Sequence, residues 1–133
     1  MYKKLIQYAI EAKKKSYSPY SNFKVGAAVL TSNSNIYTGT NIENSSYPAT
    51  ICAERVAISK AVSQGDHLLE MIVIVGDAPL TYPCGICRQF IQEFATENME
   101  IVVAKDIDTY KVYKIEDLLP YSFSKIQLEE KNV

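Results

Sequence analysis

The chain has 133 residues, of which 47% are hydrophobic and 22% charged, and these values predict one globular domain over residues 1–133. Five glycines and five prolines exclude collagen-like and low-complexity chains, and a net charge of −1 provides no basic field for gathering nucleic acid. No apolar run approaches the roughly 20 residues of a membrane span, and Glu11 interrupts the region where a secretory signal would be cleaved. We therefore expect a cytoplasmic protein.

Hydrophobic periodicity predicts elements in the order helix, hairpin, helix, strand, helix, strand, strand. They are an amphipathic helix around Leu5–Ala12, strands Lys24–Thr31 and Ile36–Asn41 about a turn at Ser32–Asn35, a helix at Ile51–Gln64, a strand at Glu70–Val75, a helix at Gly85–Ala95, strands at Glu100–Ala104 and Tyr110–Ile115, a short turn at Glu116–Leu119 and a polar tail. Strands that alternate with helices after an opening hairpin predict a three-layer α/β domain with a mixed sheet.

Three cysteines, Cys52, Cys84 and Cys87, carry the chemical signal of the sequence. An odd number of cysteines in a small chain without an export signal argues against a disulfide framework. Two of them form a C-x-x-C pair, which in a reducing compartment indicates metal binding or thiol redox chemistry.

The predicted elements bring these cysteines to the starts of two helices. Cys84 and Cys87 are three residues apart at one helix start, so their sulfurs share a face, and Cys52 opens the other helix. Free N–H groups and the positive end of the helix dipole favour thiolate there. Three thiolates that converge suit a soft divalent cation, and Zn²⁺ is the non-redox choice.

The fourth coordination position separates a structural site from a catalytic one. His67 is the only histidine, so a closed Cys₃His site is the structural alternative. It follows Gln64, which lies about 18 Å along the predicted helix axis from Cys52. This separation favours an open site, where zinc activates a water molecule near neutral pH.

Charged side chains flank the cysteines. Glu54 follows Cys52 by two residues, about 200° around a helix, which suits a proton carrier that reaches the metal-bound water without binding the metal. The alternative is a first-turn acid that complements the helix dipole. Arg55 shares the helical face of Cys52 and can donate to its sulfur. For Arg88, the other arginine, a role at the site and a surface position stay open.

Several motifs together resemble the cytidine deaminase family. They are C-A-E at Cys52–Glu54, P-C-G-I-C-R-Q at Pro83–Gln89, S-P-Y-S-N-F-K-V-G-A-A at Ser18–Ala28, N-I-E-N-S-S-Y-P at Asn41–Pro48 and L-L-P-Y-S-F at Leu118–Phe123. The resemblance implies a three-layer α-β-α fold with a mixed five-stranded sheet. It also implies hydrolysis of cytidine and deoxycytidine to uridine and deoxyuridine with release of ammonia, in pyrimidine salvage.

The resemblance assigns roles to particular residues. Cys52, Cys84 and Cys87 would hold one Zn²⁺ per subunit, zinc hydroxide would attack C4, and Glu54 would shuttle protons to N3 and the leaving amine. Arg55 would support the zinc ligands by donating to a cysteine sulfur without binding the metal. The expected substrate contacts are Phe23, Asn41, Glu43, Tyr47, Ala53 and Phe123.

The resemblance also implies that the chain assembles with copies of itself. The family predicts a homotetramer with active sites at subunit interfaces, where Tyr47 and Phe123 complete a neighbouring pocket. Asn41 and Glu43 alternate from a strand end and so point to one side, although Asn and Glu in this stretch can also stabilise a turn. Phe23, read without the family pattern, fits a core position equally well.

Two departures and three alternatives accompany this interpretation. Ile86 stands where the family commonly has a small residue, and Tyr121 enlarges the loop before Phe123; neither is a ligand. A C-x-x-C thiol oxidoreductase would leave Cys52, Glu54 and Arg55 unexplained. A non-catalytic zinc module, and a deaminase of aminonucleoside antibiotics, also share parts of the pattern. A nucleic-acid editor does not fit the neutral charge.

Overall fold

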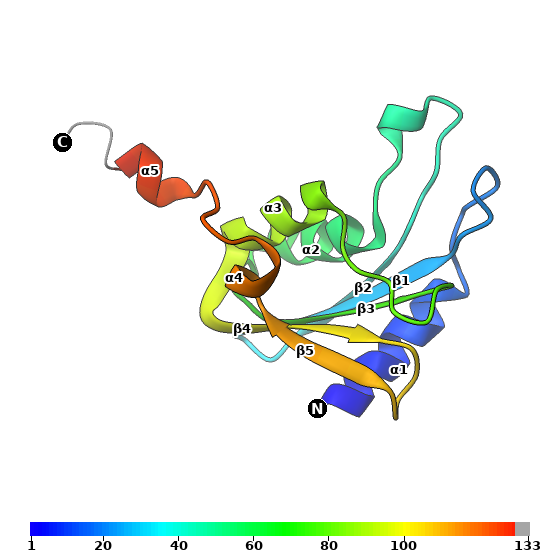
Figure 1. Cartoon of the computed structure of the whole chain (residues 1–133), viewed down its shortest axis with the longest axis horizontal. Helices are drawn as coiled ribbons and strands as arrows, with labels where there is room; N and C mark the ends of the chain where they lie inside the picture. Colours follow the sequence, from blue (N-terminus) through cyan, green and yellow to red (C-terminus); the bar gives the residue numbers. More distant parts are fainter. Residues whose placement is uncertain (130–133) are drawn as a thin grey trace.

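Helices cover both faces of a five-stranded sheet in the computed structural model, which describes residues 1–129 (Figure 1). Helix α1 (Tyr2–Lys13) packs on one face, and α2 (Ala53–Ser63) and α3 (Gly85–Phe94) pack on the other. The strands are β1 (Val25–Thr31), β2 (Ile36–Thr40), β3 (Leu69–Gly76), β4 (Ala95–Ala104) and β5 (Tyr110–Lys114), in the order β2-β1-β3-β4-β5. The predicted three-layer fold with a mixed sheet is confirmed.

Only one neighbouring pair of strands in this sheet runs parallel. β3 pairs with β4 in parallel, and α3 makes the crossover between them, whereas β1–β2, β1–β3 and β4–β5 are antiparallel. A parallel pair requires a long connection, and a helix is the usual one. The crossover places the start of α3 at the same end of the sheet as the start of α2.

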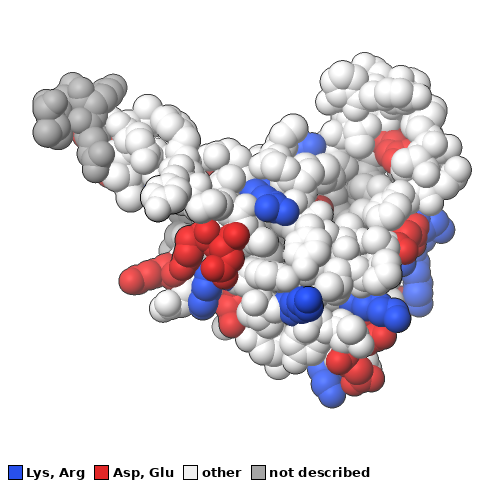
Figure 2. Space-filling view, viewed as in Figure 1, with Lys and Arg blue, Asp and Glu red and all other residues white. Residues whose placement is uncertain are grey.

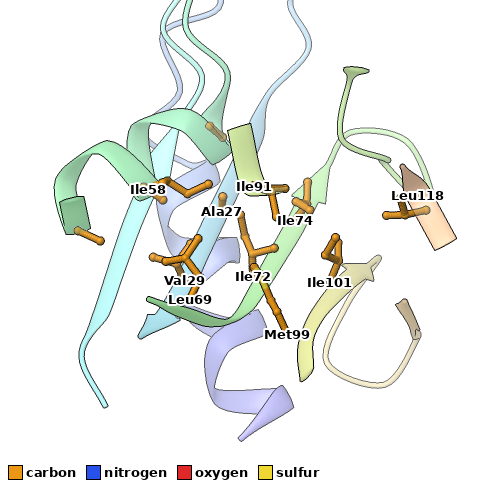
Figure 3. Packing of buried hydrophobic residues seen from close by; sticks show 13 residues of the cluster. Ala27, Val29, Ile58, Leu69, Ile72, Ile74, Ile91, Met99, Ile101 and Leu118 are labelled. Atoms are coloured by element: carbon orange, nitrogen blue, oxygen red, sulfur yellow. The ribbon is translucent and has the colours of Figure 1, made fainter. Parts of the chain in front are cut away.

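The central strand β3 divides its side chains between two cores. Ile72 and Ile74 face α2 and α3, whereas Val73 and Val75 face α1, as the two-residue period of a strand requires. Figure 3 shows the first of these cores, where Ile58 of α2 and Ile91 of α3 meet the sheet. Burial on both faces explains the continuous apolar run of β3.

Several boundaries differ from the predicted ones for identifiable reasons. Helix α2 begins after Cys52 because Ile51 keeps an extended backbone, bonded in both directions to Ile42 at 2.9 Å. Strand β4 begins at Ala95, which pairs with Leu69 before the register shifts. Three short helices were not predicted. Helix η1 (Tyr47–Ala49) lies between the predicted strand and helix, α4 (Ile115–Leu118) overlaps the predicted turn, and α5 (Lys125–Glu129) lies in the polar tail.

A glycine fixes the position of α2 on the sheet. A Cβ atom on Gly39 of β2 would lie 2.5 Å from the carbonyl oxygen of Ala53 and 2.5 Å from the amide nitrogen of Ala57. Only glycine allows this approach of strand and helix backbones. The contact sits under the first turn of α2 and so positions the residues that follow Cys52.

Candidate metal centre and substrate cavity

Three cysteines lie together where α2 and α3 begin. Cys52 precedes α2 and Cys84 precedes α3, both with an extended backbone, and Cys87 lies in the first turn of α3. Their three sulfur atoms lie within 4.8 Å of one another, and the sulfurs of Cys52 and Cys84 are 3.8 Å apart. The predicted convergence of the two stretches on one point is confirmed.

The sulfur geometry fits zinc. Two sulfurs that each lie about 2.3 Å from a tetrahedral zinc ion are about 3.8 Å apart, whereas a disulfide needs about 2.05 Å. All three cysteines are free thiols. Cys52 and Cys84 stand at helix N-termini, where N–H groups and the dipole favour negative charge. The donor set and its spacing are therefore those of a zinc site.

Among residues 1–129, the cluster of ligand-type side chains around these sulfurs contains the three cysteines alone. His67, the candidate for a closed Cys₃His site, lies beyond Ser63, where α2 ends, at the opposite end of the helix from Cys52. The described residues would therefore hold zinc through three protein ligands, which is the number that catalytic zinc sites use.

Cys52 loses its proton more readily than Cys87, with which it shares a hydrogen bond. A hydrogen bond from Cys87 lowers the pKa of Cys52 to about 5, and Arg55 acts in the same direction. Nη2 of Arg55 lies 3.8 Å from this sulfur and 3.3 Å from the carbonyl oxygen of Thr50. The pKa of Cys87 is raised, because it shares its proton with Cys52 and is buried. Arg55 therefore lies against the sulfur that carries the charge.

Glu54 is a buried acid beside the cluster. Glu54 is 3% exposed. Burial raises the pKa of its carboxyl to about 7, and the charge of Cys52 acts in the same direction. Cys52 has an extended backbone, so the predicted helical angle between these two residues does not apply. Glu54 lies close to the cysteine cluster because it is the second residue of α2 and follows the fully buried Ala53. A carboxyl with a pKa near neutrality can both accept and deliver a proton.

Asn41 fixes the loop that leads into β1. Its Nδ2 donates to the carbonyl oxygen of Phe23 at 2.8 Å, and its Oδ1 accepts from the amide of Val25 at 3.0 Å and from the hydroxyl of Ser16. An amide has a second N–H, which stays available for a ligand. Phe23 itself is 37% exposed, so the alternative of a core phenylalanine is wrong.

Glu43 is an ionised carboxylate held by a neighbouring loop. Its Oε1 accepts from the amides of Tyr20 at 2.9 Å and Ser21 at 3.1 Å, and Oε2 accepts from the hydroxyl of Ser21. These bonds, that of the Ser21 hydroxyl first, lower the pKa of Glu43. Oε1 already accepts two hydrogen bonds, whereas Oε2 accepts one and keeps a further lone pair for a ligand.

A cavity of about 400 Å³ is lined by Tyr20, Ser21, Glu43, Tyr47 and Thr50. Its volume lies in the range of small-molecule sites. The lining comes from two loops that lie side by side beyond β1 and β2, joined by pairing of Tyr17 with Ile42 (Figure 1). Figure 2 shows the surface hollowed between these loops and the rest of the molecule. The carbonyl oxygen of Thr50, one of the lining residues, accepts from Arg55 at 3.3 Å, and the same nitrogen of Arg55 lies 3.8 Å from the sulfur of Cys52.

Sequence reasoning missed three of the residues that line this cavity: Tyr20, Ser21 and Thr50. The first two lie inside the S-P-Y-S-N-F motif, so the motif itself carried the signal. Tyr20 and Ser21 lie near Glu43 because Tyr17 pairs with Ile42. No local sequence pattern predicts this long-range pairing.

The two aromatic residues expected at a subunit boundary occupy different places. Tyr47 is 70% exposed and lines the cavity of its own chain, where its ring lies 5.8 Å from that of Tyr20. Phe123 is 59% exposed in the segment after α4, and its carbonyl oxygen accepts from Gln89 at 2.9 Å. Ile86 and Tyr121, the departures from the family pattern, are also exposed.

Comparison with known proteins agrees with this site. Residues 1–104 match the family model of the cytidine and deoxycytidylate deaminase zinc-binding region. The chain belongs to this family. It is 45% identical over 130 residues to a cytidine deaminase of Sporosarcina psychrophila, which covers 94% of this chain and 93% of that protein. It is also 45% identical over 128 residues to a probable cytidine deaminase of Dictyostelium discoideum, covering 94% of this chain and 85% of that one.

Solved structures of the family share the fold. The cytidine deaminase of Burkholderia pseudomallei superposes with a TM-score of 0.84 at 39% identity, covering 90% of this chain and 97% of that one. The enzyme of Mycobacterium tuberculosis gives 0.79 at 34% identity, covering 90% and 94%. The family model describes a zinc-binding region, so family membership favours the metal site over the thiol-oxidoreductase alternative.

Proposed function

We propose that this chain catalyses the hydrolytic deamination of cytidine and deoxycytidine, in which water and the nucleoside give the uracil nucleoside and ammonia. One observation carries the proposal: a buried carboxyl with a raised pKa, Glu54, stands beside three sulfurs whose spacing fits zinc. When bound, zinc supplies Lewis acidity and an activated water nucleophile. The names of the relatives support the same reaction.

Glu54 carries the protons of this reaction. Its carboxylate accepts a proton from the attacking water and delivers it to N3 of the cytosine ring. A proton then passes to the departing amine, so that ammonia leaves. Burial supports this role, because a carboxyl shielded from solvent exchanges protons with the substrate rather than with bulk water. Arg55 balances the thiolate charge at Cys52.

The cavity and the loops beside it bind the nucleoside in this proposal. Glu43 and Asn41 contact the sugar hydroxyls, Phe23 packs against the nucleoside, and the backbone at Ala53 contacts the base edge. The charge on Glu43, its place in the cavity lining and the free N–H of Asn41 support the sugar contacts. A carboxylate that meets sugar hydroxyls would repel a phosphate, which favours nucleosides over nucleotides.

We also propose a cytoplasmic homotetramer, in which Tyr47 and Phe123 complete the pocket of a neighbouring subunit. Exposed aromatic side chains near the site support an interface, since aromatic residues are enriched at protein–protein contacts. Three free thiols suit a reducing compartment. No helix within residues 1–129 has the length and apolar character of a membrane span. The molar mass in solution tests the assembly.

The experiment that tests the activity follows purified protein incubated with cytidine, by ultraviolet absorbance and by ammonia release. We expect stoichiometric uridine and ammonia, loss of turnover after a zinc chelator, and recovery when Zn²⁺ is restored. Turnover that persists in chelator-treated, zinc-free protein would contradict the proposed chemistry. A zinc-loaded chain without turnover would instead indicate the non-catalytic zinc module.

A further inference from the structure

Arg88 follows the last cysteine of the cluster and joins two distant parts of the chain. Its Nε donates to the carbonyl oxygen of Pro83 at 2.8 Å, and its Nη1 donates to the carbonyl oxygen of Leu118 at 2.8 Å. Pro83 immediately precedes Cys84, and Leu118 is the last residue of α4. Arg88 is half-buried, and both bonds are partly shielded from solvent.

Arg88 holds the backbone of Cys84 from both sides. Its amide donates to the carbonyl oxygen of Cys84 itself at 3.0 Å, while its side chain takes the carbonyl of the residue before it. Cys84 is exposed and has a non-helical backbone, and packing does little to fix its orientation. Hydrogen bonds from a single neighbouring residue therefore fix the two peptide groups that flank this sulfur ligand.

The bond to Leu118 ties this arrangement to the C-terminal segment. The carbonyls in the last turn of a helix have no partner within the helix, and a cation there is favourable. Leu118 is a buried member of the core under α2 and α3, so its carbonyl is a fixed point for Arg88 (Figure 3). Gln89, the next residue, donates to Phe123 further along the same segment.

We propose that Arg88 is a positioning residue for the metal centre, which sets the orientation of Cys84 by bonding Pro83 and Leu118 at once. This role rests on the proposed function only in requiring that the cysteines bind zinc. Arg55 and Arg88 then support different ligands. Arg55 contacts the sulfur of Cys52 directly, whereas Arg88 bonds the backbone next to Cys84. The surface-residue alternative for Arg88 is set aside by its two side-chain bonds.

Zinc affinity tests this proposal in the intact chain. Zn²⁺ is titrated against a colorimetric chelator with the wild type, Arg88→Ala, Arg88→Lys and Gln89→Ala. We expect Arg88→Ala to bind zinc about 10–100-fold more weakly, the usual effect of removing a group that orients a ligand. Arg88→Lys should be intermediate, because an ammonium lacks the planar fork that spans two carbonyls. Gln89→Ala keeps the bond to Pro83 and should match the wild type.

Thermal unfolding of the zinc-free proteins separates positioning from simple loss of stability. A purely structural arginine would lower the melting temperature of Arg88→Ala while leaving its zinc affinity at the wild-type value, and that result would overturn the proposal. So would equal weakening in Gln89→Ala. If Arg88→Ala does not fold, Arg88→Lys decides alone, since wild-type affinity in that variant contradicts the proposal. A wild type that binds zinc without deaminating cytidine defeats the proposed function only.

Discussion

The starts of α2 and α3 meet at the cysteine cluster, yet they are fixed in different ways. At α2, Ala53 and Glu54 are buried, and the helix backbone rests directly on Gly39 of the sheet. At α3, Cys84, Gly85 and Ile86 are all exposed, and hydrogen bonds from Arg88 hold the turn. Packing therefore fixes the half that carries the acid, and polar contacts fix the half that carries two of the three sulfurs.

This contrast predicts different effects for substitutions at the starts of the two helices. A change at the start of α2 should affect chemistry or stability, because its residues are buried and one of them is the acid. A change at the start of α3 should affect metal binding first, because two sulfurs depend on that turn. Four substitution experiments test the contrast.

The largest effect is expected from Glu54→Gln. The amide has the same shape but carries no transferable proton, so cytidine turnover should fall by about 10²–10⁴-fold. The zinc content and the melting temperature should stay at wild-type values, since removing the charge of a buried carboxyl costs the fold little. Steady-state kinetics, metal analysis and thermal unfolding measure the three quantities.

Glu97→Gln is the matched control for this variant. Glu97 is exposed on β4, so the substitution makes the same chemical change outside the site. It should retain full activity. Turnover of Glu54→Gln within a few fold of the wild type would remove Glu54 from its role and restore the alternative of a helix-dipole acid.

Cys87→Ala should abolish stoichiometric zinc binding and lower stability. Cys87 is fully buried, so its loss removes a ligand and leaves a small cavity that costs about 1 kcal/mol more. Cys84→Ala is the informative partner because Cys84 is exposed. Metal analysis should show zinc lost from both variants. The zinc-free melting temperature should fall only for Cys87→Ala, and an equal fall for Cys84→Ala would contradict the contrast in burial.

Two glycines give a direct test of how each helix start is held. Gly39→Ala forces a methyl group to within 2.5 Å of two backbone atoms of α2 and should destabilise the protein by about 1–3 kcal/mol. Gly85→Ala meets nothing within 4 Å and should be neutral or stabilising by less than about 1 kcal/mol. Urea denaturation of both variants measures the free energies. A destabilised Gly85→Ala would show that α3 is also held by close packing.

These glycines also mark the limit of what the sequence could predict. The strands, the three long helices and the cysteine cluster were all predicted, because hydrophobic periodicity and C-x-x-C spacing are local patterns. The contact between Gly39 and Ala53 is not local, and glycine in a strand pattern carries no information about its partner.

The cavity was harder to predict for the same reason. Glu43 was expected to bind sugar, but its bonds to Tyr20 and Ser21 come from a loop more than twenty residues earlier. The start of β4 was missed because Thr96, Glu97 and Asn98 are polar and lack strand alternation. Backbone pairing with Leu69 overrides that weak local preference.

The far end of α2 extends the comparison, because a buried carboxylate anchors the loop that follows it. Asp66 is 5% exposed and accepts from four neutral donors of the β1–β2 hairpin: Thr31 Oγ1 at 2.8 Å, Asn33 Nδ2 at 3.0 Å, Asn35 Nδ2 at 2.8 Å and Tyr37 OH at 3.2 Å. These bonds, that of Asn35 first, lower the pKa of Asp66. Helix α3, in contrast, continues directly into β4 at Ala95.

Asp66→Asn should therefore show the most pH-dependent effect. A carboxyl whose pKa is lower in the folded state contributes stability above its unfolded pKa of about 3.9, and this contribution is lost as the pH falls through the folded pKa. At pH 7 the variant should melt several degrees below the wild type, because the amide accepts fewer hydrogen bonds. Below pH 4 the difference should shrink, since the wild-type carboxylate becomes protonated. Melting temperatures from pH 7 to pH 3 measure this convergence. A difference that stays constant over the range would contradict the lowered pKa of Asp66, because the hairpin donors would then stabilise the protonated and the ionised carboxyl equally.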